Sequence, residues 1–125
     1  MGIIGYGDIG QACGRLAKAF QMNVIALRRR TEQTEAELKE GVVQQLYGPP
    51  DMLKLIAASD YIVMAMPFTP ATHKLFGADA VAAMKPNAVF INVGRGKCVD
   101  EDALILALQS GVPQQQCCRL SRNIA

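Results

Sequence analysis

A glycine-rich segment near the start of the chain has the spacing of a phosphate-binding loop. The residues Gly5-Tyr6-Gly7-Asp8-Ile9-Gly10 fit the pattern G-x-G-x-x-G, and they follow a short apolar run and open a stretch with helical periodicity. Gly5 would permit a tight turn, Gly7 would let the backbone approach a pyrophosphate, and Gly10 would let the helix pack closely against a sheet. The amides that open this helix would face the phosphates. We therefore expect all six residues to contact a dinucleotide; the alternative is a glycine-rich turn without a ligand.

Three consecutive arginines, Arg28, Arg29 and Arg30, lie where such a site reads the adenosine ribose. Arg28 lies 18 residues after Gly10, close to the usual spacing of about 20 at which an acidic residue accepts a hydrogen bond from the 2′-hydroxyl of NAD. A guanidinium cannot accept that bond, but it binds a phosphate bidentately. At about 1.5–3 kcal/mol per hydrogen bond to a charged group, one contact favours NADP over NAD roughly tenfold or more. The predicted contacts are Arg28 and Arg29; the alternative is three solvated arginines on a loop.

The elements that must position these residues alternate along the chain. Apolar runs rich in Ile and Val predict strands at residues 2–4, 24–27, 61–66 and 88–93, with a weaker strand at 42–46. Helices are predicted at residues 32–40, from Pro49 to Ala57, at 79–84, and from a cap at Asp100 to Gly111. After the glycine loop, one apolar stripe is expected to face the core: Ile9, Cys13, Leu16, Ala17 and Phe20. The pattern predicts an α/β fold, a Rossmann-type doubly wound parallel sheet.

Composition limits the classes of function. The chain has 125 residues, half of them hydrophobic, a formal net charge of +2 and a pI of about 8.4. That charge is too small for a nucleic-acid or membrane surface, and no apolar run approaches the roughly 18 residues of a membrane span. The four cysteines, Cys13, Cys98, Cys117 and Cys118, lack a zinc-binding spacing. We expect a cytoplasmic protein with reduced thiols, no metal, no nucleic acid and no membrane partner.

Two further motifs narrow the class of protein. Met66-Pro67-Phe68-Thr69-Pro70-Ala71-Thr72 and Ile91-Asn92-Val93-Gly94-Arg95-Gly96 each follow a predicted strand, at the sheet edge where open α/β folds bind ligands. Together with the glycine loop, they make the chain resemble the D-isomer-specific 2-hydroxyacid dehydrogenases, which include D-lactate, phosphoglycerate and hydroxypyruvate/glyoxylate enzymes. The resemblance extends from Gly2 to about Gly111.

The resemblance implies roles for particular residues. Arg95 corresponds to the catalytic arginine that holds the substrate carboxylate and polarises its carbonyl, which suits a planar guanidinium. Pro67 and Thr72 would line the adenine and ribose side, and Val93 and Gly94 would pass beside the nicotinamide. The implied substrate is a small 2-hydroxyacid or 2-ketoacid, and a homodimer would follow the family. His73, the single histidine, lies in cofactor-side structure of that family, so we interpret it as a surface residue and not as the catalytic acid.

The sequence also departs from the family pattern. The family's acid/base histidine and its partner glutamate have no counterpart here, nor does its substrate domain. Residues 112–125 do not resemble the strand expected next, so we predict a dinucleotide-binding domain at residues 1–111, a divergent, poorly ordered tail at 112–125, and a sheet that is incomplete at its C-terminal edge. Without the acid/base pair, activity should be slight.

Three functions stay open at this point. The chain is the NADP-favouring cofactor domain of a 2-hydroxyacid dehydrogenase; or a non-catalytic dinucleotide-sensing module that resembles the C-terminal-binding-protein corepressors; or a truncated product without independent activity. The first predicts dinucleotide binding, the second ligand-dependent assembly without turnover, and the third a failure to accumulate as folded protein.

Overall fold

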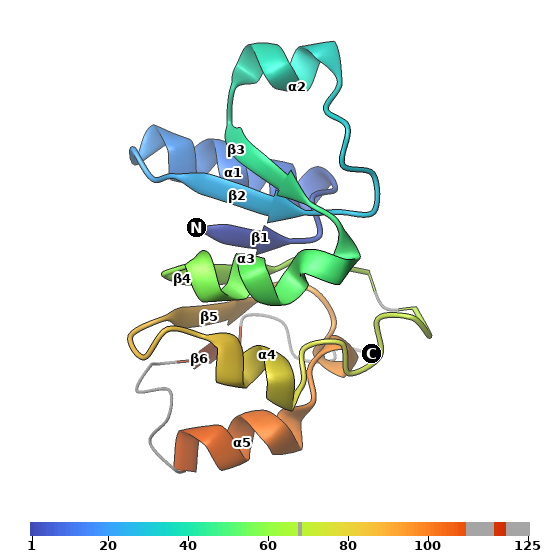
Figure 1. Cartoon of the computed structure of the whole chain (residues 1–125), viewed down its shortest axis with the longest axis vertical. Coiled ribbons are helices and arrows are strands. Elements are labelled where there is room, and N and C mark those ends of the chain that lie inside the picture. Colours follow the sequence, from blue (N-terminus) through green and yellow to red (C-terminus); the bar gives the residue numbers. More distant parts are fainter. Residues whose placement is uncertain (68, 110–116, 120–125) are drawn as a thin grey trace.

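The computed structural model describes residues 1–67, 69–109 and 117–119, and within them six parallel strands form one sheet (Figure 1). The sheet order is β3-β2-β1-β4-β5-β6. The strands are β1 (Gly2–Ile4), β2 (Val24–Leu27), β3 (Val43–Tyr47), β4 (Tyr61–Met64), β5 (Val89–Asn92) and β6 (Cys117–Arg119). The order runs outward from β1 in one direction and then reverses to place β4 on the other side of β1, which is the doubly wound arrangement. The predicted fold class is confirmed.

Helices cover both faces of this sheet (Figure 1). They are α1 (Asp8–Ala19), α2 (Glu35–Glu40), α3 (Met52–Ala58), α4 (Ala78–Ala83) and α5 (Glu101–Gln109), with short 3-10 turns η1 (Pro49–Asp51) and η2 (Gly96–Cys98). Successive residues of β1 point to opposite faces. Ile3 packs in the cluster under α1, and Ile4 packs in the cluster under α3, α4 and α5. None of the helices in the described residues is long and apolar enough to cross a membrane.

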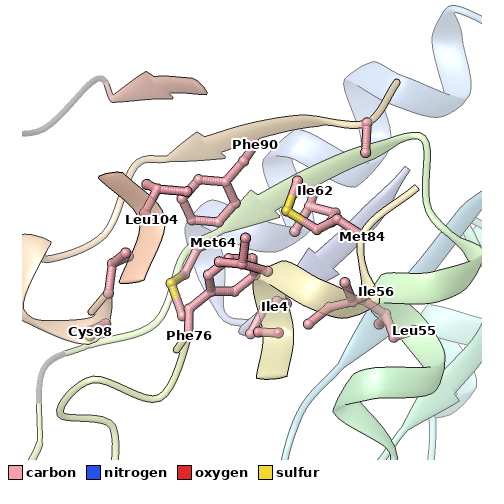
Figure 2. Close-up of a cluster of buried hydrophobic side chains, with 14 of the residues drawn as sticks. Ile4, Leu55, Ile56, Ile62, Met64, Phe76, Met84, Phe90, Cys98 and Leu104 are labelled. Carbon is pink, nitrogen blue, oxygen red and sulfur yellow. The ribbon is translucent and has the colours of Figure 1, made fainter. Parts of the chain in front are cut away.

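The larger core lies on the α3, α4 and α5 side (Figure 2). Its centre is formed by Phe76 and Phe90, which are almost fully buried and whose rings stack at a centroid distance of 4.3 Å. Figure 2 shows side chains around these rings from β1, β4, α3, α5, the C-terminal end of α4 and η2: Ile4, Leu55, Ile56, Ile62, Met64, Met84, Cys98 and Leu104. This core anchors the strands whose carboxyl ends carry the predicted site.

The predicted core face of α1 holds for Ala17, which is buried, and for Cys13, which packs against the core, but it is wrong for the three large side chains. The buried positions of α1 are Gly10, Gly14 and Ala17, whereas Ile9, Leu16 and Phe20 are 58%, 64% and 79% exposed. A Cβ at Gly10 would collide with the carbonyl oxygen of Gly5, and one at Gly14 would lie 3.3 Å from the Tyr6 ring. The helix approaches the sheet so closely that only its small residues fit there, and this requirement overrides the apolar periodicity.

Most element boundaries agree with the prediction to within a few residues. The 61–66 and 88–93 strands are shorter than predicted, and α2 begins at Glu35 because Thr34 caps it. Asp100 caps α5 as predicted, since its carboxylate accepts a hydrogen bond from the amide of Ala103 at 3.3 Å. The predicted end of that helix, Gly111, lies outside the described residues.

The C-terminal edge of the sheet differs from the expectation. β6 pairs with β5 in parallel, with Phe90 opposite Cys117 and Asn92 opposite Arg119. β6 was not predicted from the sequence, and it lies within the predicted tail at 112–125, whose poor order stays a prediction. Without β6, the edge of β5 would present unpaired backbone N–H and C=O groups, to which an extended segment can bind. Because such pairing uses backbone groups, it does not require an apolar periodicity in the sequence. Residues 110–116 and 120–125 lie outside the described residues, so the domain boundary at 111 stays a prediction.

Candidate functional site

Gly5 forms the turn between β1 and α1 at the carboxyl edge of the sheet. Its φ is +96°, a conformation that L side chains rarely adopt. A Cβ there would lie 2.9 Å from the carbonyl oxygen of Ala65, and the Gly5 amide donates to the carbonyl of Leu27 at 2.9 Å. The glycine loop therefore begins where β1, β2 and β4 meet, beside the reversal of strand order at which doubly wound sheets bind ligands.

Gly7 leaves an open approach to the positive end of α1. A Cβ at Gly7 would meet no atom within 4 Å, and no side chain caps the helix there. The first hydrogen bond within the helix runs from the amide of Gln11 to the carbonyl of Gly7 at 2.8 Å. The amides of Asp8, Ile9 and Gly10 therefore have no partner inside the helix. Amides and helix dipole together form a site of the kind that binds phosphate.

Tyr6 lies in the same loop but faces inward. Its side chain is only 8% exposed and packs in the core under α1. Burial raises the pKa of the Tyr6 hydroxyl, and the Arg28 guanidinium lies 5.9 Å above the ring centroid. Tyr6 is therefore a core residue of the loop, whereas Asp8 and Ile9 are exposed.

The loops after β4 and β5 meet beside the glycine loop. The amides of Val93 and Gly94 both donate to the carbonyl of Met64, at 3.0 and 3.1 Å. A Cβ at Gly94 would lie 2.7 Å from the carbonyl oxygen of Met66. The carboxyl ends of β1, β4 and β5 thus present backbone to one shared edge, and Val93 and Gly94 lie on it. Their contact with a nicotinamide stays a prediction.

Asn92 positions the loop that carries Arg95, and sequence reasoning assigned it no role. Its side chain is 1% exposed. The Asn92 Oδ1 accepts a hydrogen bond from the Gly94 amide at 3.0 Å, and its Nδ2 donates to the Arg95 carbonyl at 3.3 Å. The backbone of Arg95 is therefore held while its side chain is exposed. The signal in the sequence is an asparagine at the end of an apolar run. Such a side chain is expected to be buried, and a buried amide group requires hydrogen-bond partners.

The Thr72 hydroxyl is engaged within its own turn. It accepts a hydrogen bond from the Thr69 amide at 2.8 Å and lies 3.0 Å from the carbonyl oxygen of Pro67. The Thr72 amide in turn donates to the Thr69 hydroxyl at 3.2 Å. These bonds shape the loop after β4 and leave Pro67 exposed. Contact of Pro67 and Thr72 with an adenosine stays a prediction.

Arg28 is not a solvated arginine, because most of its guanidinium donors are engaged. It donates bidentately to Glu37, with Nη1–Oε1 at 2.7 Å and Nη2–Oε2 at 2.8 Å. It also donates to the carbonyls of Arg30 at 2.6 Å and Glu32 at 2.7 Å, and its side chain is 13% exposed. Arginine has five N–H donors, and these contacts engage four of them. Arg29 and Arg30 are exposed.

Glu37 was missed at the sequence level, although the spacing Thr34-x-x-Glu37 is that of a capping box. Both capping bonds form, from the Glu37 amide to the Thr34 hydroxyl and from the Thr34 amide to the Glu37 carboxylate. The hydrogen bonds from Arg28, followed by that from the Thr34 amide, lower the pKa of Glu37 to about 2. The hydrogen bond with Glu37 likewise raises the pKa of Arg28.

Charged contacts hold α2 to the rest of the molecule. The helix has no buried residues, and Figure 1 shows it at one end of the molecule. Besides the Arg28–Glu37 pair, an exposed pair joins Arg15 to Glu40 at 2.8 Å. Lys18 donates to the carbonyls of Glu40 and Gly41 at 2.9 and 2.7 Å. The loop from β2 to α2 is therefore anchored by ion pairs and hydrogen bonds.

His73 lies in an exposed position and lines an open hollow of about 300 Å³. The hollow includes Lys74, Lys97 and Asp100 but no residue of the glycine loop. Interpretation of His73 as a surface residue, not as a proton carrier, stays a prediction.

Comparison with known proteins agrees with this geometry. The model of the family described as "D-isomer specific 2-hydroxyacid dehydrogenase, NAD binding domain" matches residues 1–116. The glyoxylate/hydroxypyruvate reductase B of Shigella boydii is 43% identical over 112 residues, which are 89% of this chain and 33% of that protein. A D-isomer specific 2-hydroxyacid dehydrogenase from Xanthobacter autotrophicus Py2, in complex with NADPH and MES, has a TM-score of 0.81 and 29% identity, covering 100% of this chain and 50% of that one. A D-lactate dehydrogenase from Aquifex aeolicus, complexed with NAD and lactic acid, has a TM-score of 0.76 and 29% identity, covering 93% of this chain and 33% of that one.

The chain belongs to the D-isomer-specific 2-hydroxyacid dehydrogenase family and comprises its NAD(P)-binding domain. The resemblance inferred from the sequence motifs is thereby confirmed. The chain spans about a third of the length of the curated relatives it matches.

Proposed function

We propose that this chain is the cofactor-binding domain of an oxidoreductase that acts on a small 2-hydroxyacid or 2-ketoacid and prefers NADP to NAD. The observation that carries the proposal is the open backbone at Gly7, directly before the uncapped positive end of α1. A pyrophosphate needs both features, because it approaches the backbone closely and is bound by helix N-terminal amides.

The residues present fit a nicotinamide dinucleotide. The amides of Asp8 to Gly10 would hold the pyrophosphate, and the backbone of Val93 and Gly94 would form a wall beside the nicotinamide. When bound, the cofactor supplies or accepts a hydride at C4 of the nicotinamide. Arg95 would hold the substrate carboxylate through a bidentate contact, which its planar guanidinium favours. Asn92 keeps the Arg95 backbone in place.

The proton that accompanies hydride transfer needs a donor, commonly worth about 10²–10⁴ in rate. The family's histidine and glutamate have no counterpart in this sequence, and we assign no such role to His73. We therefore expect this chain alone to bind cofactor and to turn over slowly. Relatives named as glyoxylate/hydroxypyruvate reductase and D-lactate dehydrogenase support a small 2-ketoacid as the substrate class.

The preference for NADP rests on the charge at the end of β2. Arg28, Arg29 and Arg30 follow this strand in place of an acid, and the last two are exposed. A 2′-phosphate carries up to two negative charges and would be attracted to this cluster. Solved relatives of the family include complexes with NAD and with NADPH. Membership of the family therefore does not decide between the two cofactors, and we base the preference on this loop.

A single substitution tests the proposal with little risk to folding. The backbone of Gly7 has φ −89° and ψ −154°, which other residues adopt readily, and its Cβ position is open. Gly7→Val should therefore fold, while its side chain fills the space that the pyrophosphate needs. Calorimetric titration should show micromolar binding of NADPH to the native chain and a loss of at least about tenfold in Gly7→Val.

The matched control is Ala12→Val, which places the same valine side chain at an exposed position of the same helix. It should bind NADPH like the native chain. If the folded native chain gives no heat with either dinucleotide, or if Gly7→Val binds as tightly as Ala12→Val, the proposed site is wrong.

A further inference from the structure

Arg28 lies at the ribose end of the site, but another residue of the chain already occupies it. The Arg28 amide donates to the carbonyl of Tyr47 on β3 at 3.1 Å, so its backbone belongs to the end of β2. Its guanidinium lies over the Tyr6 ring of the glycine loop. Glu37, from α2, accepts hydrogen bonds from two nitrogens of this guanidinium at 2.7 and 2.8 Å. A carboxylate bound in this way uses the same paired N–H groups that a phosphate would use.

We propose that Glu37 is a specificity-determining residue that competes with the 2′-phosphate of NADP for the guanidinium of Arg28. This inference rests on the proposed function, in which a dinucleotide binds at the glycine loop. With NAD bound, Arg28 stays on Glu37. With NADP bound, the phosphate exchanges for the carboxylate, so discrimination is weaker than a free arginine would give.

The surroundings of Glu37 allow such an exchange. Its Oε2 also accepts a hydrogen bond from the Thr34 amide at 2.9 Å, and this bond does not depend on Arg28. Because α2 buries no side chain, releasing Arg28 breaks no apolar packing of this helix. The Arg15–Glu40 pair and the Lys18 contacts hold the far end of α2 independently. Exchange therefore replaces one anion with another on the guanidinium, and a doubly charged phosphate competes well for it.

The test measures NADPH and NADH affinity in the native chain and in Glu37→Gln. Glutamine retains an oxygen that can accept the Thr34 amide, but it removes the charge that holds Arg28. NADPH should bind about tenfold more tightly, which corresponds to one charged hydrogen bond gained, while NADH affinity should stay within about twofold.

Glu40→Gln is the matched control. It removes the same charge from the same helix and breaks the Arg15 pair, but it does not touch Arg28. Its NADPH to NADH affinity ratio should stay within about twofold of the native ratio, since an exposed charge is largely screened. An equal gain in both variants would show a general charge effect and overturn the inference. A ratio in Glu37→Gln that is unchanged or lower would also overturn it.

A measurement on the native chain covers the case in which Glu37→Gln does not fold. The side-chain N–H signals of Arg28 in NMR spectra should shift when NADPH is added and should stay in place with NADH. Signals that respond identically to the two ligands would overturn the inference although both dinucleotides bind. Absence of binding by either dinucleotide would instead contradict the proposed function, so the two failures are distinguishable.

Discussion

Two ends of the candidate site are held by different forces. At the nicotinamide end, the loops after β4 and β5 are fixed by backbone hydrogen bonds, by the buried Asn92 and by the core around Phe90. At the ribose end, the loop before α2 is held by Arg28, Glu37 and exposed charges, and α2 buries no side chain. Close packing admits few alternatives, whereas ion pairs can exchange partners. Under the proposed function, the first end would set the reaction geometry and the second would tune the cofactor choice.

The largest expected effect is on the packed end. Phe90→Ala should reduce the free energy of unfolding by about 3–5 kcal/mol, because Phe90 is 1% exposed and its ring stacks on Phe76. Chemical denaturation monitored by circular dichroism would measure this. Phe20→Ala removes the same ring from a position that is 79% exposed and should change stability little. Equal effects of the two substitutions would contradict the description of the core.

A smaller effect is expected at Asn92. Asn92→Ala removes two side-chain hydrogen bonds, one to the Gly94 amide, which keeps the Met64 carbonyl as an acceptor, and one to the Arg95 carbonyl, and their loss costs about 1–3 kcal/mol. Hydrogen exchange at the Gly94 amide should quicken more than at the amides of β1. Asn87→Ala, at an exposed turn, is the control and should leave both measurements unchanged. Unaltered exchange at Gly94 would show that Asn92 does not position this loop.

The ribose end should respond to acid before the core does. The pKa of Glu37 is about 2 in the folded chain and 4.5 ordinarily. A group whose pKa is lowered by folding contributes its full stabilisation above its ordinary pKa, and this is lost as pH falls through the folded value. Hydrogen exchange of α2 should therefore quicken, relative to β4, as pH falls from about 4.5 towards 2. The intrinsic exchange rate must be corrected at each pH. Glu37→Gln should reduce the pH dependence at this end, and the part that remains comes from Glu40, whose pKa the hydrogen bond from Arg15 also lowers.

Several features could be predicted from residue types and spacing alone. Continuous apolar runs of strand length predicted five parallel strands, because parallel sheets are buried on both faces. The glycine loop was recognisable because turn, close approach and helix packing each require a residue without a side chain. Asp100 was recognisable as a cap because its carboxylate can satisfy a free helix amide. Each of these depends on interactions between neighbours in the chain.

Other features could not be predicted in this way. The periodicity of α1 assigned Ile9, Leu16 and Phe20 to the core, but close contact with the Gly5 turn and Tyr6 left room only for small residues. The pairing of β6 with β5 left no mark in the side-chain pattern, since it uses backbone groups.

The sequence by itself determined the class of fold and the place of the glycine loop, because local sterics and hydrogen bonding dictate them, and the resemblance of its motifs indicated the family. Only the tertiary structure decided that Arg28 is bound by Glu37 and that Asn92 holds the Arg95 loop. The Arg28–Glu37 ion pair joins the end of β2 to α2, and its geometry depends on where folding places α2 relative to β2. An ion pair of this kind has no signature in spacing, because either charge could equally well face water.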